Sequence, residues 1–103
     1  SSMPGVGDAL GFLYLRQGDY AKAETAYGDV TTNNAAVAQI LNHNYSKAIK
    51  TLEAIAKPDA TTDYLRAIVA ARMGDSAKAI SSLQKALQKD PSLTSRGGRP
   101  MAL

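Results

Sequence analysis

The sequence contains no cysteine and only one histidine, His43. Without cysteine there is no disulfide framework, no thiolate nucleophile and no sulfur-ligated zinc. A single histidine, with no second histidine and no cysteine, gives little support to a metal site or a catalytic triad. The nine carboxylates are spread singly along the chain. We therefore expect no catalysis, no metal and no cofactor.

Long apolar runs and basic clusters are also missing. The apolar runs are too short to cross a bilayer. The formal net charge is +3, but Arg96 and Arg99 lie in a Gly-rich stretch near the end, and the remaining bases and acids nearly balance. A nucleic-acid-binding protein would carry a basic stripe. We expect neither membrane insertion nor nucleic-acid binding from this chain of 103 residues, which is long enough for one compact domain.

The chain contains an internal repeat. The segment GDYAKA at 18–23 recurs as GDSAKA at 74–79, with five of six positions identical. A weaker copy, HNYSKA, occupies 43–48, so the three copies follow one another at spacings of 25 and 31 residues. Three related copies indicate a repeat architecture.

Each copy lies between two segments with helical periodicity. The segments before the copies, 8–17, 34–41 and 62–73, are apolar on several faces, which is typical of buried helices. The segments that follow the last two copies share an apolar stripe, and the polar positions between, Thr51 and Ser82 among them, are expected to face water. The stripe residues are Ala48, Ile49, Leu52, Ile55 and Ala56, matched by Ala79, Ile80, Leu83, Ala86 and Leu87. The pattern predicts six helices in three antiparallel hairpins.

The turns carry residues suited to helix ends. His43 stands in the slot that Gly18 and Gly74 occupy in the other copies, and this slot favours a positive φ, which His tolerates better than most residues. We interpret His43 as a turn residue. Asp19 and Asp75 directly precede second helices, where a carboxylate can cap the helix N-terminus.

These residues resemble the tetratricopeptide repeat, whose pattern is W-x-x-L-G-x-x-Y, then A-x-x-x-F or Y, then P. The first copy contains Leu10-Gly11-x-x-Tyr14 and Ala23-x-x-x-Tyr27. The third contains Ala67, Ala79-x-x-x-Leu83 and Asp90-Pro91. The resemblance implies an all-α fold, a right-handed stack of three antiparallel helix hairpins forming a TPR-like α-solenoid. The middle repeat is expected to be shortened, because both spacings fall below the usual 34 residues.

The resemblance also gives domain boundaries. Residues 1–7 are expected to be a flexible segment, residues 8–91 the repeat domain, and residues 92–103 a partial cap followed by a flexible tail. Three positions depart from the family pattern. Gly7 and Asp63 stand where the family prefers a large apolar residue, and Arg66 stands where it prefers leucine. We therefore expect hairpin interiors that are less filled than in the family.

The resemblance implies a protein-interaction module that binds a peptide or protein segment. In this family the first helices of the hairpins line a concave surface. The matching positions here are Phe12, Leu15, Arg16, Val37, Ile40, Leu41, Tyr64, Ile68, Ala71 and Arg72. An apolar surface with two cations suits a segment that buries apolar side chains and offers a carboxylate to Arg16 or Arg72. The alternative interpretation is that Phe12, Leu15 and Ile40 are simply core residues.

The C-terminal edge is a second expected contact, because only residues 92–96 are available to cover the last helix. That edge would meet the tail, another domain, or a second copy in a homo-oligomer. A looser likeness to short repeat segments of bacterial cell-envelope proteins suggests a periplasmic or envelope location, although the sequence does not exclude the cytoplasm. The alternative function is a structural spacer or oligomerisation domain of a larger envelope protein, with no ligand in the groove.

Overall fold

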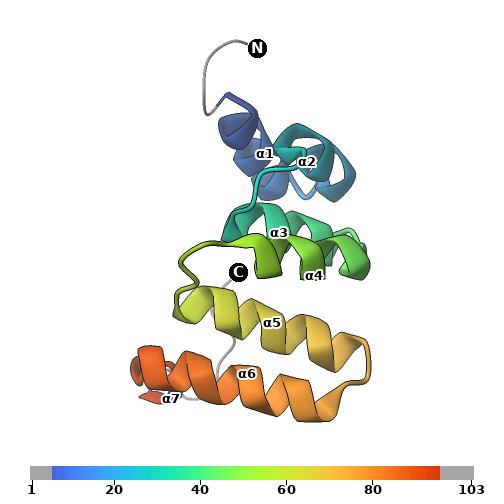
Figure 1. Ribbon diagram of the computed structural model, residues 1–103. Coiled ribbons are helices and arrows are strands. Elements are labelled where there is room, and N and C mark those ends of the chain that lie inside the picture. The colour runs from blue at the N-terminus through green and yellow to red at the C-terminus, as the bar shows by residue number, and fades with distance from the viewer. Residues whose placement is uncertain (1–5, 96–103) are drawn as a thin grey trace. The chain divides into compact units, whose positions relative to one another are not determined.

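The structure, a computed structural model, describes residues 6–95 (Figure 1). Over these residues it is helical with no strand. The helices are α1 (Val6–Gln17), α2 (Tyr20–Tyr27), α3 (Asn33–Leu41), α4 (Tyr45–Ala54), α5 (Ala60–Arg72), α6 (Ser76–Lys89) and the short α7 (Ser92–Ser95). The prediction of six helices in three antiparallel hairpins is confirmed. Of the segments expected to be flexible, residues 1–5 and the tail from Gly97 lie outside the described residues, whereas Val6 and Gly7 belong to α1.

The chain divides into two compact units, Ser1–Ala56 and Lys57–Leu103. In the first unit α1 pairs with α2 and α3 pairs with α4, and the two hairpins pack together because α3 contacts both α2 and α1. In the second unit α5 pairs with α6, and α7 packs on α6.

The predicted turn and cap residues are confirmed. His43 has a φ of 61°, beside 80° for Gly18 and 83° for Gly74. The carboxylates of Asp19 and Asp75 accept hydrogen bonds from the backbone N–H groups of Lys22 and Lys78, at 3.2 and 3.1 Å. In each repeat turn a residue with left-handed backbone therefore ends the first helix of the hairpin. In two of the three turns the next residue is an aspartate that caps the second helix.

The middle turn differs, since Asn44 makes no side-chain cap. Its Nδ2 instead donates to Oε2 of Glu24 at 2.8 Å, while Nδ2 of Asn42 donates to Oε1 of the same carboxylate at 3.0 Å. Glu24 lies on α2, so its carboxylate ties the first hairpin to the turn of the second. Hydrogen bonds to a charged acceptor are stronger than neutral ones, which favours a fixed turn here.

The core of the first unit is built around Tyr27. Its ring is buried together with small residues of α2 and α3, and Tyr14 and Leu15 of α1 pack against this cluster. The cluster consists of Ala23, Tyr27, Ala35 and Ala38. Because its partners are alanines, one large ring fills the space between the two hairpins.

Two glycines let α1 approach α2 closely. A Cβ atom on Gly11 would lie 2.6 Å from the Tyr27 ring, and one on Gly7 would lie 2.7 Å from the carbonyl oxygen of Ala26. Both distances are far below van der Waals contact. The departure of Gly7 from the family pattern thus has a physical reason, because a large side chain there would push the helices apart.

Five expectations about burial were wrong. Thr51 and Ser82 are buried, whereas Ala56, Ile80 and Leu83 are exposed. The inner face of α6 runs through Ala79, Ser82 and Ala86, which are three or four residues apart, and Ile80 lies to one side of it. A small side chain such as serine fits where two helices approach closely.

The first helix α1 is also less buried than its apolar sequence predicted. Leu10, Phe12 and Leu13 are all exposed, and the one fully buried residue among those described in α1 is Gly11. The helix α3, by contrast, buries five of its residues. The difference arises because α3 lies against α2 as well as α4, whereas in the described unit α1 lies against only α2 and α3.

The second unit contains an ion pair that replaces apolar packing. The Asp63 carboxylate is buried on α5, and Nζ of Lys89 at the end of α6 lies 2.8 Å from its Oδ2. The same ammonium donates to the carbonyl oxygen of Pro58 at 2.9 Å, and Nη1 of Arg66 lies 3.5 Å from Oδ1 of Asp63. Asp63 and Arg66, which depart from the family pattern, therefore pair with each other, and Asp63 also pairs with Lys89.

Candidate protein-binding surface

The predicted binding residues of α1 form an exposed apolar and cationic pair. Phe12 is exposed, and the guanidinium carbon of Arg16 lies 5.9 Å from the centre of its ring. One turn of helix separates the two residues, so the cation lies over the aromatic face. Leu15 is half-buried and packs against the Tyr27 cluster. In this part of α1 an aromatic ring and a positive charge face the solvent, and Leu15 beside them packs into the core.

The predicted residues of α3 belong partly to the core. Ile40 is buried, while Val37 and Leu41 are half-buried. Ile40 is therefore a core residue, as the alternative interpretation proposed, and it offers little area to a ligand. Since α1 and α3 are in contact, the two sets of residues lie on neighbouring helices of the first unit.

The predicted residues of the second unit lie along one face of α5. Tyr64 and Ile68 are half-buried, and Ala71 and Arg72 are exposed. Residues four apart lie on the same side of a helix, so Tyr64, Ile68 and Arg72 form a row. The row repeats the chemistry of α1, with an aromatic ring and an arginine.

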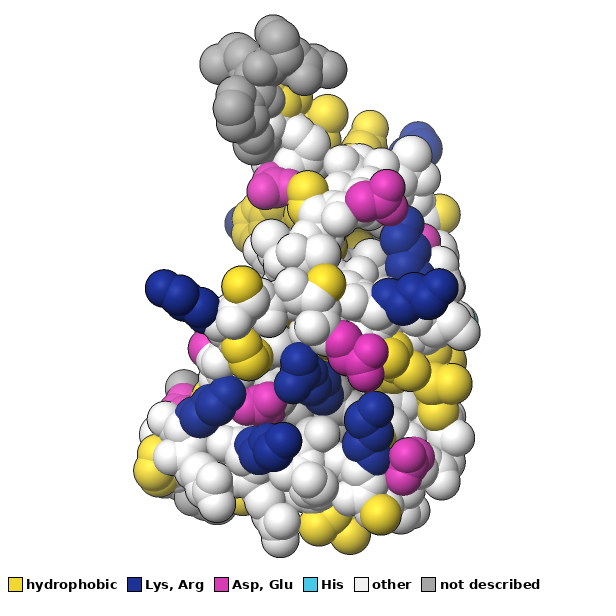
Figure 2. Space-filling model, viewed as in Figure 1, with side chains coloured by type: hydrophobic (Ala, Val, Ile, Leu, Met, Phe, Trp, Pro, Cys, Tyr) yellow, Lys and Arg dark blue, Asp and Glu magenta, His cyan; other side chains and the backbone are white. Residues whose placement is uncertain are grey.

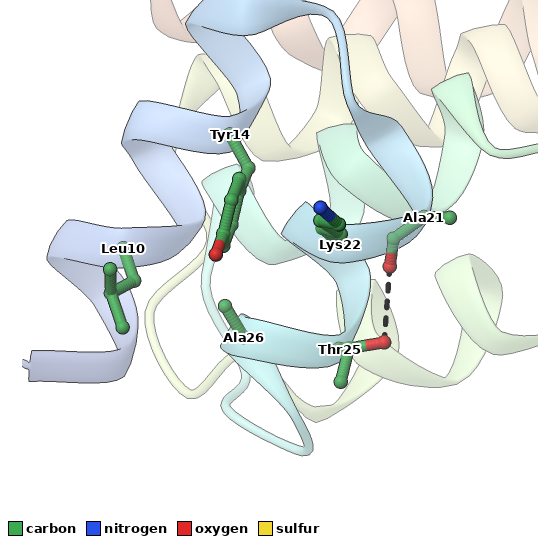
Figure 3. Close-up of a pocket in the computed structure, with 6 residues that line it drawn as sticks. All are labelled: Leu10, Tyr14, Ala21, Lys22, Thr25 and Ala26. Carbon is green, nitrogen blue, oxygen red and sulfur yellow. Dashed lines mark hydrogen bonds between the residues drawn. The ribbon is translucent and has the colours of Figure 1, made fainter.

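A hollow of about 380 Å³ between α1 and α2 was not predicted. Six residues line it: Leu10, Tyr14, Ala21, Lys22, Thr25 and Ala26. Figure 3 shows Leu10 and Tyr14 on α1 facing the side chains of α2. Nζ of Lys22 lies 5.9 Å from the centre of the Tyr14 ring and 3.7 Å from Oδ2 of Asp19, and Thr25 donates to the carbonyl oxygen of Ala21. The repeat register contained a signal for this site, because Leu10 and Leu13 stand where the second hairpin has Ala35 and Ala38.

Electrostatics at the first hairpin concern Tyr27. Burial raises the pKa of the Tyr27 phenol above its usual 10.0, and the nearby negative charge of Asp8 raises it further. Both causes disfavour the phenolate. The phenol therefore stays neutral over the physiological range and acts as a packing group.

The described residues contain no group of three or more His, Asp or Glu side chains that could hold a metal ion. No helix among them has the length and apolarity that a membrane span needs.

An array of helical hairpins with glycine or histidine turns, small residues at helix contacts and aromatic rings between hairpins defines an all-helical repeat protein. The family model described as Tetratricopeptide repeat matches residues 8–36 and 62–92, which together exceed half of the chain. The chain belongs to the tetratricopeptide repeat family. The matched ranges leave out most of the shortened middle hairpin. Neither a curated protein nor a solved structure matches the chain.

Tetratricopeptide repeats generally mediate protein–protein interactions, and proteins of this family are typically non-enzymatic scaffolds. The expected protein-interaction role thus agrees with the family.

Proposed function

We propose that the chain is a non-catalytic module that binds a peptide or protein segment, and that Phe12 and Arg16 on α1 make the principal contact in the first unit. The observation that supports this proposal is the exposed Phe12 ring with the Arg16 guanidinium above it. Exposed aromatic residues beside arginine are enriched at protein interfaces, because a ring buries a large area and an arginine binds carboxylates in a fixed geometry.

The chemistry of this surface selects the class of segment. Phe12, Val37 and Leu41 offer apolar area to one or two aliphatic or aromatic side chains. Arg16 offers two parallel donors to a carboxylate, which adds geometric specificity. We therefore propose a segment with an apolar anchor followed or preceded by Asp or Glu.

The experiment is selection of a random displayed peptide library on the full chain, followed by affinity measurement of the selected peptides on purified variants. Arg16→Glu is expected to weaken binding about tenfold or more, since about 1.4 kcal/mol corresponds to a factor of ten. Phe12→Ala is expected to weaken it by a similar factor. Lys50→Glu is the matched control, because Lys50 is an exposed base on α4 outside this surface.

The proposal fails if the selected peptides bind both α1 variants as tightly as they bind the unmodified chain. If the same peptides lose affinity only for Tyr64→Ala and Arg72→Glu, the α5 row of the second unit is the contact instead. If no peptide is selected at all, the alternative of a spacer or oligomerisation domain is favoured. A location in the bacterial envelope is part of that alternative proposal, and it rests only on the looser likeness to envelope repeat segments.

A further inference from the structure

The first unit shows how one hairpin of this chain recognises the next. Tyr27 of α2 lies against Ala35 and Ala38 of α3, and all three residues are buried. The second helix of one hairpin thus presents a large side chain to small residues on the first helix of the following hairpin. This contact is the template for what exposed helix faces of the same kind can bind.

The template identifies one uncovered face on α1. The 25-residue spacing places Leu10 at the position of Ala35 and Leu13 at that of Ala38. Ala35 and Ala38 are buried by α2, whereas Leu10 is 44% exposed and Leu13 is 54% exposed. Together with the half-buried Val6 they form a stripe at i, i+4 and i+7, which we call the α1 stripe.

The template identifies a second uncovered face on α6. The two spacings together place Leu83 at the position of Tyr27. Leu83 is 39% exposed and Ile80 is 58% exposed, and with the half-buried Leu87 they form the α6 stripe at i, i+3 and i+7. Figure 2 shows hydrophobic atoms at the lower edge of the view, where α6 lies.

The α1 stripe borders an open hollow. Leu10 and Tyr14 are among the residues that line it, and its volume is about 380 Å³. The α6 stripe provides branched apolar side chains of the size that such a hollow accepts. Exposed apolar faces of this kind mark association sites.

The charges also favour contact between the two faces. Along residues 6–28 the first hairpin has three carboxylates and two bases, whereas along residues 60–90 the α5–α6 hairpin has three carboxylates and five bases. Figure 2 shows basic side chains gathered over the α5–α6 hairpin. Opposite net charges on two faces steer their encounter and disfavour the pairing of two identical faces.

We propose that the chain associates head to tail with a second copy of itself, the α6 stripe of one copy packing on the α1 stripe and hollow of the next. In this contact a large apolar side chain on the second helix of one hairpin packs on the first helix of another, as Tyr27 packs on α3 within the chain. It joins two different patches, so each copy keeps one free stripe, and association continues into rings or filaments. The proposal does not depend on peptide binding, because Phe12 and Arg16 lie outside both stripes.

Sedimentation of the full chain with two variants tests the proposal. The average mass of the unmodified chain is expected to rise with concentration. Leu13→Glu and Leu83→Glu each place a charge in one stripe at an exposed position, so each variant alone is expected to be a monomer with unchanged helicity by circular dichroism. An equimolar mixture is expected to form a one-to-one dimer, because each variant retains the stripe that the other has lost.

The mixture distinguishes head-to-tail contact from symmetric contact. If two α1 stripes paired with each other, Leu83→Glu alone would still associate, and if two α6 stripes paired, Leu13→Glu alone would. Gln88→Glu, an exposed substitution on α6 outside the stripe, is the control and should associate as the unmodified chain does. An unmodified chain that is monomeric at about 1 mM, or a mixture that stays monomeric, overturns the proposal. Neither result would affect the peptide-binding experiment.

Discussion

The buried charge of Asp63 makes Lys89 a large contributor to the stability of the second unit. The Asp63 side chain is only 2% exposed, and the ammonium that lies 2.8 Å from its Oδ2 belongs to a lysine whose side chain is 42% exposed. Lys89→Met removes the charge and keeps most of the aliphatic stem. The variant therefore leaves a buried carboxylate with Arg66, whose Nη1 lies 3.5 Å away, as its remaining cation.

The magnitude follows from these contacts. Removing one partner of a fully buried ion pair costs about 3–5 kcal/mol. Lys89 is partly solvated and Arg66 remains, so we expect a smaller loss of about 2–3 kcal/mol in the free energy of unfolding. The hydrogen bond from Lys89 to Pro58, which joins the end of α6 to the residues before α5, is lost as well.

Urea unfolding of the full chain, followed by circular dichroism, measures this change. Lys85→Met is the control, because Lys85 is an exposed lysine on the same helix and its loss should change stability by less than about 0.5 kcal/mol. Asp63→Asn removes the buried charge. The double variant Asp63→Asn with Lys89→Met should be more stable than the sum of the single effects predicts, by about 1–3 kcal/mol. Equal losses for Lys89→Met and Lys85→Met would refute the reasoning.

Three further predictions concern the first unit. Gly11→Ala should lower the free energy of unfolding by about 1–3 kcal/mol by urea titration, although alanine usually stabilises a helix, because the new methyl group meets the Tyr27 ring; no loss would contradict this packing. His43→Gly should be more stable than His43→Ala by about 1 kcal/mol in thermal unfolding, since the residue has a positive φ, and equal stability would argue against strain there. Because the pKa of Tyr27 is raised in the folded state, the phenol of the unfolded chain ionises at a lower pH than that of the folded chain. The contribution of Tyr27 to stability is therefore full below pH 10.0 and is lost as the pH rises through the folded pKa. Tyr27→Phe should remove this part of the alkaline loss of stability in a pH series of unfolding curves.

Local features were the most predictable from the sequence. The positive φ of His43 followed from its place in a slot that glycine occupies twice, and the caps of Asp19 and Asp75 followed from the residue type before each helix. These properties depend on neighbours within a few residues. The hairpin pairing followed from the short turns for the same reason.

Contacts between distant residues were not predictable. Asp63 and Lys89 lie on different helices, and nothing in their local sequence indicates that they meet. The burial of Ser82 depends on how closely α6 approaches its partner helix, which a hydrophobic pattern does not report. The exposure of Leu13 depends on which helices pack against α1, and its apolar side chain alone suggested burial. The candidate binding residues were predictable only as positions of the family pattern, and Ile40 shows that such a position can be occupied by a core residue.

Tyr27 belongs to the cores of two hairpins at once. Its ring lies against Gly11 of α1 on one side and in a cluster with Ala35 and Ala38 of α3 on the other. If the first hairpin opens, α3 loses the side chain that covers it, so the two hairpins cannot open independently. We expect the amide protons of α2 and α3 to exchange with solvent through one shared opening event. By this reasoning a single aromatic side chain couples the unfolding of the first hairpin to that of α3.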